Sequence, residues 1–471
     1  MTFASFKNAR IVRSRWLEEG GRRLDCNPYM SGALEARDIL ANLSAPLDPL
    51  AEVVEDVFHA GRDARVWVAD LEHGVPFLGS TDILAADLST LPRISKRIVK
   101  SNPLFRVGEK WTLITRSGTV GRMAYVRQDA ADMACSEHVL RVVPNKKKVA
   151  PGYLHAFLAS KFGVPLVVAG TYGAIIQHIE RQHILDRVSV PRYSTDFEES
   201  IARKIDEYST LLTYYQETVC RATDQFFRSV GLEDISRVDW HENGPDLGFE
   251  IKGVTSTSLR AMNYSPRFDE LVRRIKSVPH KLLGEVCVDG TLKRGGRYKR
   301  IEASPEHAYL MVGQKQVFWL EPEGQWIAKS CVDEDVLVPP GAILIAGAGT
   351  LGESEAYCRT EFIWNDASRN AFSELFVRVI SDPNEMLCGC LYAFMRSEMA
   401  FRMLRSTSFG SKLQYPMAKL VKSLPIPIPD RPSMVEIHEL VVSAYEAREK
   451  AVRLKHEAIA RLERQIEGGG M

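Results

Sequence analysis

The residues with the clearest chemical spacing follow a predicted strand at 342–346. Gly347, Gly349 and Gly352 are spaced as in the glycine fingerprint of dinucleotide-binding proteins. In those proteins the glycine loop opens a helix whose N-terminus binds pyrophosphate. Here the acidic stretch Glu353-Ser-Glu355 follows, and it would repel a phosphate at that point. A tight strand-turn-strand with positive φ at Gly118 and Gly349 is therefore favoured. A nucleotide-dependent enzyme using residues 347–352 is the alternative.

Other catalytic patterns are weak or missing in the sequence. Asp246, Glu250 and Lys252 have the residue types of a metal-dependent nuclease, but three residues are too few for a hairpin between Asp246 and Glu250. No Walker A loop, Asn-Pro-Pro-Tyr methyltransferase motif or Gly-x-Ser-x-Gly elbow occurs. The eleven histidines show no metal-ligand spacing. We therefore expect a chain that is not an enzyme and binds neither a metal nor a cofactor.

Positive charge gathers in matching places in the two halves of the chain. Residues 293–300, Lys-Arg-Gly-Gly-Arg-Tyr-Lys-Arg, hold five cations and no acid. Glycines let a backbone approach phosphate, and arginine can bind the O6 and N7 atoms of guanine together. We predict DNA contact by the following basic residues: Arg62, Arg65, Arg93, Lys96, Arg97, Lys293, Arg294, Arg297, Lys299 and Arg300.

Residues shared by both halves are expected to contact phosphates, because identical residues cannot distinguish two different DNA sequences. Base reading is expected where the halves differ, including the loops at 79–88 and 314–317. The predicted base-reading residues are Thr171, Gln177, His178, Ser408, Lys412, Gln414 and Tyr415.

The two halves of the chain match each other at a nearly constant distance. Gly61-Arg62 recurs as Gly296-Arg297, which lies 235 residues later. Residues 117–121, Ser-Gly-Thr-Val-Gly, are matched 231 residues later by Ala-Gly-Thr-Leu-Gly, and Val190-Pro191 is matched 236 residues later by Ile426-Pro427. Loop insertions produce such small changes of offset. Matches in one consistent order indicate an internal duplication.

A long helical segment without glycine or proline follows each copy, at 196–228 and at 433–467. In both segments apolar residues alternate at spacings of four and three, which is the pattern of a coiled-coil seam. We expect an antiparallel coiled coil; the alternative is two separate surface helices. The expected seams are Ile201, Ile205, Tyr208, Leu212, Tyr215, Val219, Ala222 and Phe226 in the first helix, and Leu440, Ala444, Ala447, Ala451, Leu454 and Ala458 in the second.

Short apolar strands mixed with short helices in each copy predict an α+β fold. Strands are expected at 65–68, 111–114, 309–312 and 342–346, and short helices at 151–161 and 384–402. The expected domains are a first globular domain at 1–193, a spacer helix at 194–231, a second globular domain at 232–430 and a C-terminal spacer helix at 431–471.

The length and composition of the chain limit the number of domains and the cellular compartment. The chain has 471 residues, enough for two or three domains, and a formal net charge of +1, so any basic surface must be local. No apolar run is long enough to span a membrane, and the N-terminus lacks the apolar core of a signal peptide. Eight cysteines without a CxxC pair are typical of a reducing compartment. We expect a cytoplasmic protein without a membrane partner.

The chain also carries a Tyr-Gly...Gln loop at 172–177, Leu-Pro-Ile-Pro-Ile-Pro at 424–429 and the segment 61–83. Together with the twofold repeat, the turn at 117–121 and the heptad helix after each copy, these motifs resemble the specificity subunit of type I DNA restriction-modification systems. The resemblance covers nearly the whole chain. One departure is that the second copy reads Tyr-Leu-Met-Val at 309–312 where the first reads Val-Pro-Phe-Leu at 75–78.

The resemblance implies two target recognition domains, each reading one half of a split site in double-stranded DNA. It also implies that the helices hold the domains apart and bind two methyltransferase subunits, which carry S-adenosylmethionine and methylate adenine. A restriction subunit with helicase and nuclease activity is a further partner that the family allows. A target recognition subunit of a related type II system is an alternative. A dimerisation protein built on the coiled coil, without a DNA role, is another.

Overall fold

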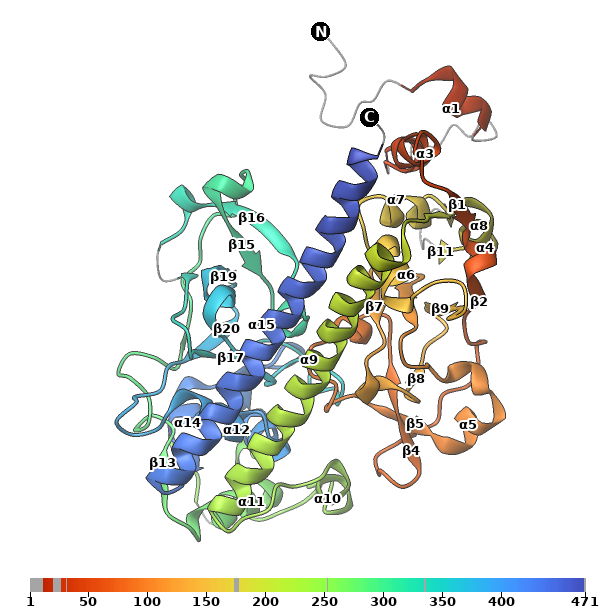
Figure 1. The fold of residues 1–471 in the computed structure, drawn as a ribbon. Helices are drawn as coiled ribbons and strands as arrows, with labels where there is room; N and C mark the ends of the chain where they lie inside the picture. The colour runs from red at the N-terminus through yellow and green to blue at the C-terminus, as the bar shows by residue number, and fades with distance from the viewer. Residues whose placement is uncertain are drawn as a thin grey trace. The chain divides into compact units, whose positions relative to one another are not determined.

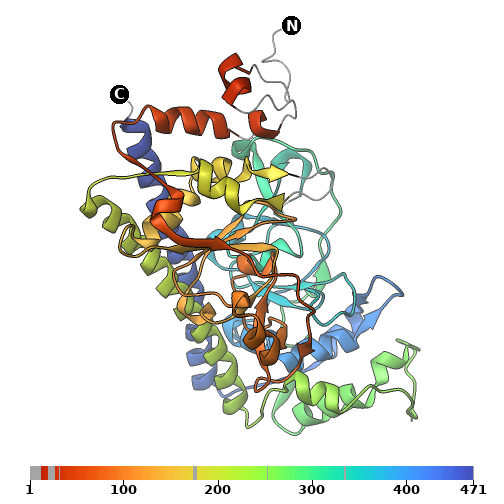
Figure 2. The same ribbon diagram turned by 90° about the vertical axis from the view of Figure 1, so that its right-hand side faces the viewer.

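The computed structural model describes residues 12–19, 27–30, 32–172, 178–251, 253–333 and 336–469. The chain forms two compact units. Unit 1 consists of Met1–Thr213 and Lys450–Met471, and unit 2 of Tyr214–Glu449. Each boundary falls inside a long helix, so both units contain a segment of both long helices (Figures 1 and 2).

The long helices are α9 (Thr195–Ser229) and α15 (Arg431–Gly468), close to the predicted segments. The hydroxyl of Ser194 accepts a hydrogen bond from the Phe197 amide at 3.4 Å, as an N-cap does. Gly231 has φ 67° and lies just beyond the other end of α9. Helix α15 begins before the predicted residue 433, because proline is tolerated in a first turn and Asp430 caps the Ser433 amide at 2.8 Å.

Within each unit the segments of α9 and α15 pack antiparallel, as predicted. All eight predicted seam residues of α9 are buried. In unit 1, Lys204 pairs with Glu457 and Lys450 with Glu207, both at 2.7 Å. In unit 2, the rings of Tyr215 and Tyr445 lie 5.3 Å apart, edge to face. The residue numbers of the contacting partners on α15 decrease as those on α9 increase, so the two helices run antiparallel.

The seam of α15 differs from the prediction. Leu440 and Leu454 are only half-buried. For Leu440 the cause lies in unit 2, where α15 also packs on a sheet and Arg448 pairs with buried Glu361 at 2.6 Å. A helix buried on two sides has a wider apolar face than a coiled-coil seam. The buried positions of α15 are Met434, Ile437, Val441, Ala444, Tyr445, Ala447, Arg448, Ala451, Ala458, Leu462 and Ile466.

Unit 1 is built on two four-stranded sheets. The first has the order β2 (Val54–Phe58), β9 (Val139–Pro144), β6 (Thr112–Thr115), β7 (Met123–Tyr125), and is antiparallel. The second has the order β3 (Trp67–Val68), β5 (Arg93–Ser95), β4 (Gly74–Leu78), β8 (Ala134–Cys135), with β4 and β8 parallel. Two antiparallel pairs complete the unit: β1 (Leu47–Pro49) with β12 (Ser189–Pro191), and β10 (Thr171–Tyr172) with β11 (His178–Ile179).

The helices of unit 1 are short apart from its segments of α9 and α15. A hydrophobic core that includes Leu78, Val107, Leu113 and Val139 lies between the two sheets. The short helices are α1 (Ser14–Glu19), α2 (Asn27–Met30), α3 (Ala33–Ala41), α4 (Leu50–Val53), α5 (Lys96–Ser101), α6 (Pro151–Leu158), α7 (Gly163–Val168) and α8 (Arg181–Arg187).

Unit 2 repeats this topology and so confirms the duplication. Its four-stranded sheet has the order β14 (Lys293–Arg294), β20 (Phe376–Val379), β17 (Ile343–Ala346), β18 (Thr360–Phe362). A second sheet has the order β16 (Gly324–Ala328), β15 (Ala308–Val312), β19 (Ala371–Phe372), again with one parallel pair. The antiparallel pairs are β13 (His280–Leu282) with β23 (Pro425–Pro427), and β21 (Ser408–Phe409) with β22 (Tyr415–Pro416).

The helix predicted at 384–402 is two helices, α12 (Cys388–Met395) and α13 (Glu398–Ser406). They are separate because Ser397 caps α13, accepting a hydrogen bond from the Ala400 amide at 3.0 Å. The unit also contains α10 (Arg237–Glu242), α11 (Pro266–Lys276) and α14 (Ala418–Lys422). Among the described residues, no helix has the length and apolarity that crossing a bilayer requires.

Candidate nucleic-acid interface

In unit 1, the turn between β6 and β7 and the hairpin β10–β11 form one surface. Gly118 and Gly121 have φ of 81° and 83°, which confirms the positive φ predicted for Gly118. A Cβ at Gly118 would meet no other atom within 4 Å, so the turn is open on its outer side. Ser117 pairs with His178 as an antiparallel bridge, and the Arg116 Nε donates to the Ile179 carbonyl at 3.1 Å.

Positive charge converges on this surface. Desolvation lowers the pKa of His178, and electrostatic interaction with Arg116, His138 and Arg62 lowers it further. The hydroxyl of Ser117 lies 2.6 Å from the Nδ1 atom of His138. The charges of the predicted residues Arg62 and His178 therefore interact. Sequence reasoning missed Arg116 and His138, although Arg116 directly precedes the glycine turn.

One ion pair occurs at the same position in both units. Arg65 pairs with Glu137 at 2.6 Å in unit 1, and Arg300 pairs with Glu374 at 3.1 Å in unit 2. The guanidinium of Arg65 also lies 5.0 Å from the centre of the Phe77 ring. Both arginines were predicted as DNA contacts, and both glutamates were missed. The repeated Ser-Glu dipeptide at 136–137 and 373–374 is the signal that could have revealed them.

The neighbouring arginines are placed differently. Arg62 and Arg297 are exposed and form no ion pair with any described residue. Lys293 and Lys299 are exposed as well. Each unit thus presents one arginine held by a carboxylate and one whose charge is available to a ligand.

The other predicted residues of unit 1 lie on separate elements. Thr171 is buried, and its hydroxyl donates to the Val168 carbonyl, so it is part of the packing of the hairpin. Arg93 lies on β5 and is half-buried, and Arg97 is exposed on α5. Gln177 lies outside the described residues.

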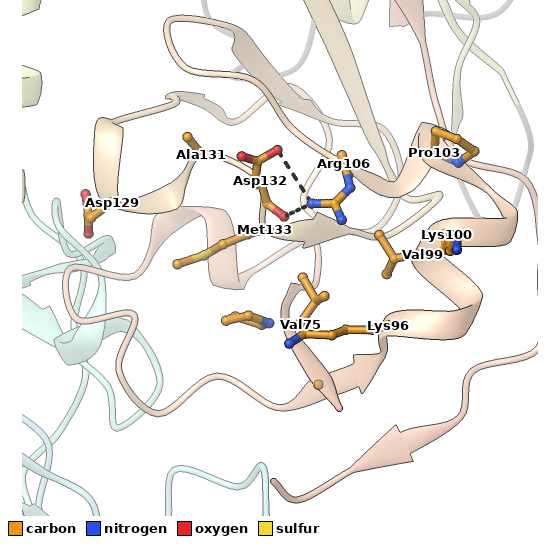
Figure 3. A pocket seen from close by; sticks show the side chains of 12 residues that line it. Val75, Lys96, Val99, Lys100, Pro103, Arg106, Asp129, Ala131, Asp132 and Met133 are labelled. Atoms are coloured by element: carbon orange, nitrogen blue, oxygen red, sulfur yellow. Dashed lines mark hydrogen bonds and ion pairs between the residues drawn. The ribbon is translucent and has the colours of Figure 1, made fainter. Parts of the chain in front are cut away.

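Lys96 lines a pocket of about 650 Å³ in unit 1 (Figure 3). Lys100, one helical turn further along α5, lines the same pocket, and Val75 and Met133 contribute apolar surface. Arg106 also lines it and pairs with Asp132 at 3.5 Å. The pocket combines the cations of Lys96, Lys100 and Arg106 with the carboxylates of Asp129 and Asp132.

In unit 2 the hairpin β21–β22 joins the corresponding turn. Gly349 and Gln414 exchange backbone hydrogen bonds of 2.7 and 3.2 Å, in the register that Ser117 and His178 have in unit 1. Ser408 is fully buried with its hydroxyl 2.7 Å from that of Tyr357. The buried Gln414 side chain donates to the Gly410 carbonyl at 3.3 Å. These two predicted base readers therefore hold the hairpin together, and their side chains do not face solvent.

Arg294 and Tyr415, both predicted, are in contact. The guanidinium of Arg294 lies 4.3 Å from the centre of the Tyr415 ring and donates to the Gly347 carbonyl at 2.9 Å. Burial lowers the pKa of Arg294. Gln314 holds the same turn, because its amide group exchanges hydrogen bonds of 2.9 and 3.0 Å with the backbone of Ala348. Lys412 is exposed at the end of the hairpin.

The glycines at 347–352 do not form a dinucleotide-binding element. Residues 347–359 contain no helix, so there is no helix N-terminus to bind pyrophosphate. The prediction of positive φ at Gly349 is wrong. Glycine is required there for a different reason, because a Cβ would lie 2.7 Å from the Cβ of Tyr357. Among the described residues, no group of histidine, cysteine or carboxylate side chains is arranged to bind a metal.

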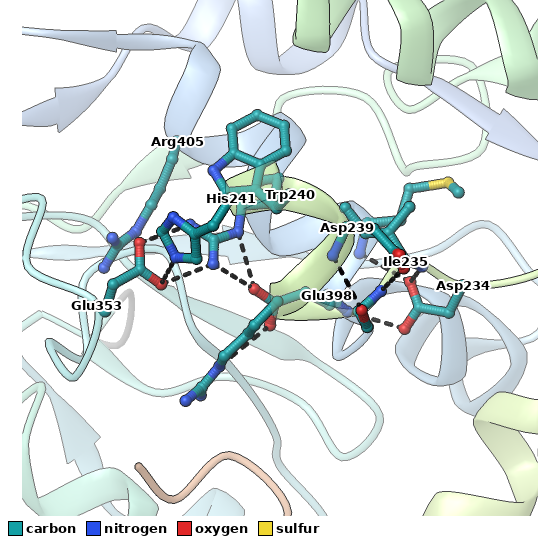
Figure 4. Close-up of polar contacts among 12 residues, drawn as sticks. Asp234, Ile235, Asp239, Trp240, His241, Glu353, Glu398 and Arg405 are labelled. Carbon is teal, nitrogen blue, oxygen red and sulfur yellow. Dashed lines mark hydrogen bonds and ion pairs between the residues drawn. The ribbon is translucent and has the colours of Figure 1, made fainter. Parts of the chain in front are cut away.

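A polar network in unit 2 has a structural role (Figure 4). Arg402 is buried and pairs with Glu353 at 2.6 Å and with Glu398 at 2.7 Å. Burial acts to raise the pKa of Glu353, but Arg402 lowers it to about 2. Asp234 accepts hydrogen bonds from the amides of Glu398 and Met399 at 3.0 and 2.8 Å, and so caps α13. The network ties the segment around α10 to α13.

Comparison with known proteins finds similarity at the level of solved structures. No protein-family model matches the sequence, and neither does any curated protein. The fold is similar to that of the type I restriction-modification S subunit from M. genitalium, with 11% identity, a TM-score of 0.34, and coverage of 91% of this chain and 96% of that one. It is also similar to the HsdS subunit from Thermoanaerobacter tengcongensis, with 11% identity, a TM-score of 0.27, and coverage of 90% and 95%.

A third similar chain comes from a structure of a type I restriction-modification system that addresses complex assembly and conformational transition. It has 13% identity, a TM-score of 0.27, and coverage of 90% of this chain and 96% of that one.

Proposed function

We propose that this chain is a non-catalytic subunit that reads a bipartite site in double-stranded DNA, with one half-site bound by each unit. The observation that carries the proposal is the repetition of one interface. In both units a glycine turn is joined to a short hairpin, and a pair of arginines lies on the loop before the second sheet. A chain with two such surfaces is suited to a ligand with two similar parts.

The interface chemistry fits a polyanion. Arg62 and Arg297 are exposed cations that can each neutralise a phosphate, releasing condensed counterions. Arg65 and Arg300 are oriented by Glu137 and Glu374, so their guanidinium groups are already ordered before a ligand binds. Because these residues are the same in both units, they support binding in a fixed orientation, and specificity must come from residues that differ.

The partners follow from the family that the sequence motifs resemble. We propose that α9 and α15 bind two methyltransferase subunits, and that S-adenosylmethionine binds to those subunits and not to this chain. Tyr214 on α9 and Val435 on α15 are exposed apolar side chains, which a partner could cover. A restriction subunit would join the same complex.

The proposal is tested by mapping methylated adenines in the genome of cells that carry the gene and of cells from which it is deleted. The expected result is one motif with two read segments separated by unread bases, methylated only in the presence of the gene. Identical methylation in both strains would contradict the proposal. A control strain with Leu247→Ala, an exposed residue outside both interfaces, should retain the motif.

A further inference from the structure

The end of the hairpin β21–β22 exposes apolar side chains in unit 2. Phe409 is 42% exposed and Leu413 is 47% exposed, and Lys412 beside them is exposed as well. Their neighbours Ser408 and Gln414 are buried. Among residues 408–416, the exposed apolar and charged side chains are Phe409, Lys412 and Leu413.

The hairpin end has a fixed shape. Gly410 has φ 108°, and a Cβ there would lie 2.3 Å from the Leu413 carbonyl oxygen. The Arg260 guanidinium donates to the Gly410 carbonyl at 2.7 Å, and the Gln414 side chain donates to the same carbonyl. A loop held in this way loses little conformational entropy on binding, so its exposed side chains can contribute to affinity.

The charge around the exposed apolar side chains is positive. Residues 408–416 contain no acid. Arg260 donates to the Gly410 carbonyl and Arg294 packs on Tyr415. Lys412, which lies between Gly410 and Tyr415 in sequence, is exposed. Apolar groups flanked by cations match a ligand that presents apolar groups between phosphates.

We infer that this hairpin enters the major groove of DNA and reads bases there, an inference that rests on the proposed function. The major groove is about 12 Å wide and admits a two-stranded β-ribbon. Phe409 and Leu413 contact the C5-methyl groups of thymine, and Lys412 donates to O6 and N7 of guanine. These three residues thereby replace Ser408 and Gln414 as the specificity-determining residues of unit 2.

The inference is tested on duplexes that contain the motif found by genomic methylation mapping, with each thymine replaced in turn by deoxyuridine. This replacement removes only the methyl group. Binding by the complex of this chain with its methyltransferase should weaken by about fourfold at each contacted position, the factor expected for one buried methyl group. Leu413→Ala or Phe409→Ala should abolish the thymine-uracil difference at one position and leave it unchanged at others. Lys412→Ala should instead relax the preference for guanine.

Matched variants separate base reading from folding. Leu247→Ala removes an exposed leucine elsewhere in unit 2 and should retain every thymine-uracil difference. Phe409→Tyr keeps the ring and should retain them too, whereas a loss of thermal stability common to all hairpin variants would assign these residues to folding and overturn the inference.

Two results have distinct meanings. If no thymine of the motif discriminates against uracil, or if discrimination survives in both alanine variants, the hairpin inference is overturned while the proposed function stands. If the gene produces no methylation motif, the proposed function itself fails, and the hairpin inference fails with it.

Discussion

Removing the charge of Arg297 should weaken DNA binding equally for all sequences. The Arg297 side chain is exposed and has no described ion-pair partner, so its charge is available to one phosphate. Each phosphate contact contributes about 0.9 to the slope of log affinity against log salt concentration. Arg297→Ala should therefore reduce the slope by about 0.9. Its loss of affinity should be about 3.5-fold greater at 50 mM than at 200 mM salt, because salt is raised fourfold between them.

Arg300 should behave differently because Glu374 lies 3.1 Å from it. Glu374→Gln removes a negative charge next to the arginine, so it should tighten binding to any duplex and steepen the salt slope. Arg300→Ala should do the opposite. The double variant Arg300→Ala with Glu374→Gln has the same net charge as the wild type and is the matched control, with a slope between those of the single variants.

The measurement is a fluorescence-anisotropy titration at five salt concentrations, with a specific and a random duplex. Arg62→Ala in unit 1 is the counterpart of Arg297→Ala and should give the same change. An unchanged slope in Arg297→Ala, with altered preference among sequences, would refute the assignment of this arginine to phosphate. It would make Arg297 a base-reading residue.

Three further predictions concern the stability of unit 2. Arg448→Leu removes the cation from buried Glu361 and should cost about 3–5 kcal/mol, measured by urea unfolding, and a loss below 1 kcal/mol would contradict it. Burial raises the pKa of Asp234 from 3.8 to about 6, so the folded state binds the proton more tightly than the unfolded state. Wild-type stability should fall as the pH rises from 3.8 to 6, and Asp234→Asn should lack that part of the pH dependence. Gly349→Ala should unfold the turn, because its Cβ would lie 2.7 Å from that of Tyr357, whereas Gly248→Ala, with open space around it, should be nearly neutral.

The repeated plan and the long helices could be predicted from sequence because their signals are periodic. All eight residues from Ile201 to Phe226 that were assigned to the seam of α9 are buried. The buried seam of α15 was harder to predict because its alanines fit several registers. Whether Leu440 or Val441 is buried depends on the sheet that packs on α15, and no local sequence pattern reveals that sheet. Arg448 would not be assigned to a buried face from sequence, because its partner Glu361 is 87 residues away.

The sequence predicted which residues lie at the site better than which way their side chains face. Arg294 and Tyr415 were both selected, and they are in contact. Ser408 and Gln414 were assigned to base reading because they lie where the two copies differ, but their hydrogen bonds lie inside the unit, with Tyr357 and Gly410 as partners. Two-residue strands are too short for alternation to show which side chain faces outward, so exposed Phe409 was not among the predicted site residues.

The most direct test of the central claim is a hydroxyl-radical footprint of the complex on its methylation motif. Two protected tracts separated by accessible bases are expected. The variant Arg62→Ala with Arg65→Ala should weaken protection of one tract, and Arg297→Ala with Arg300→Ala should weaken protection of the other. One continuous tract, or two variants that weaken the same tract, would contradict the assignment of one half-site to each unit.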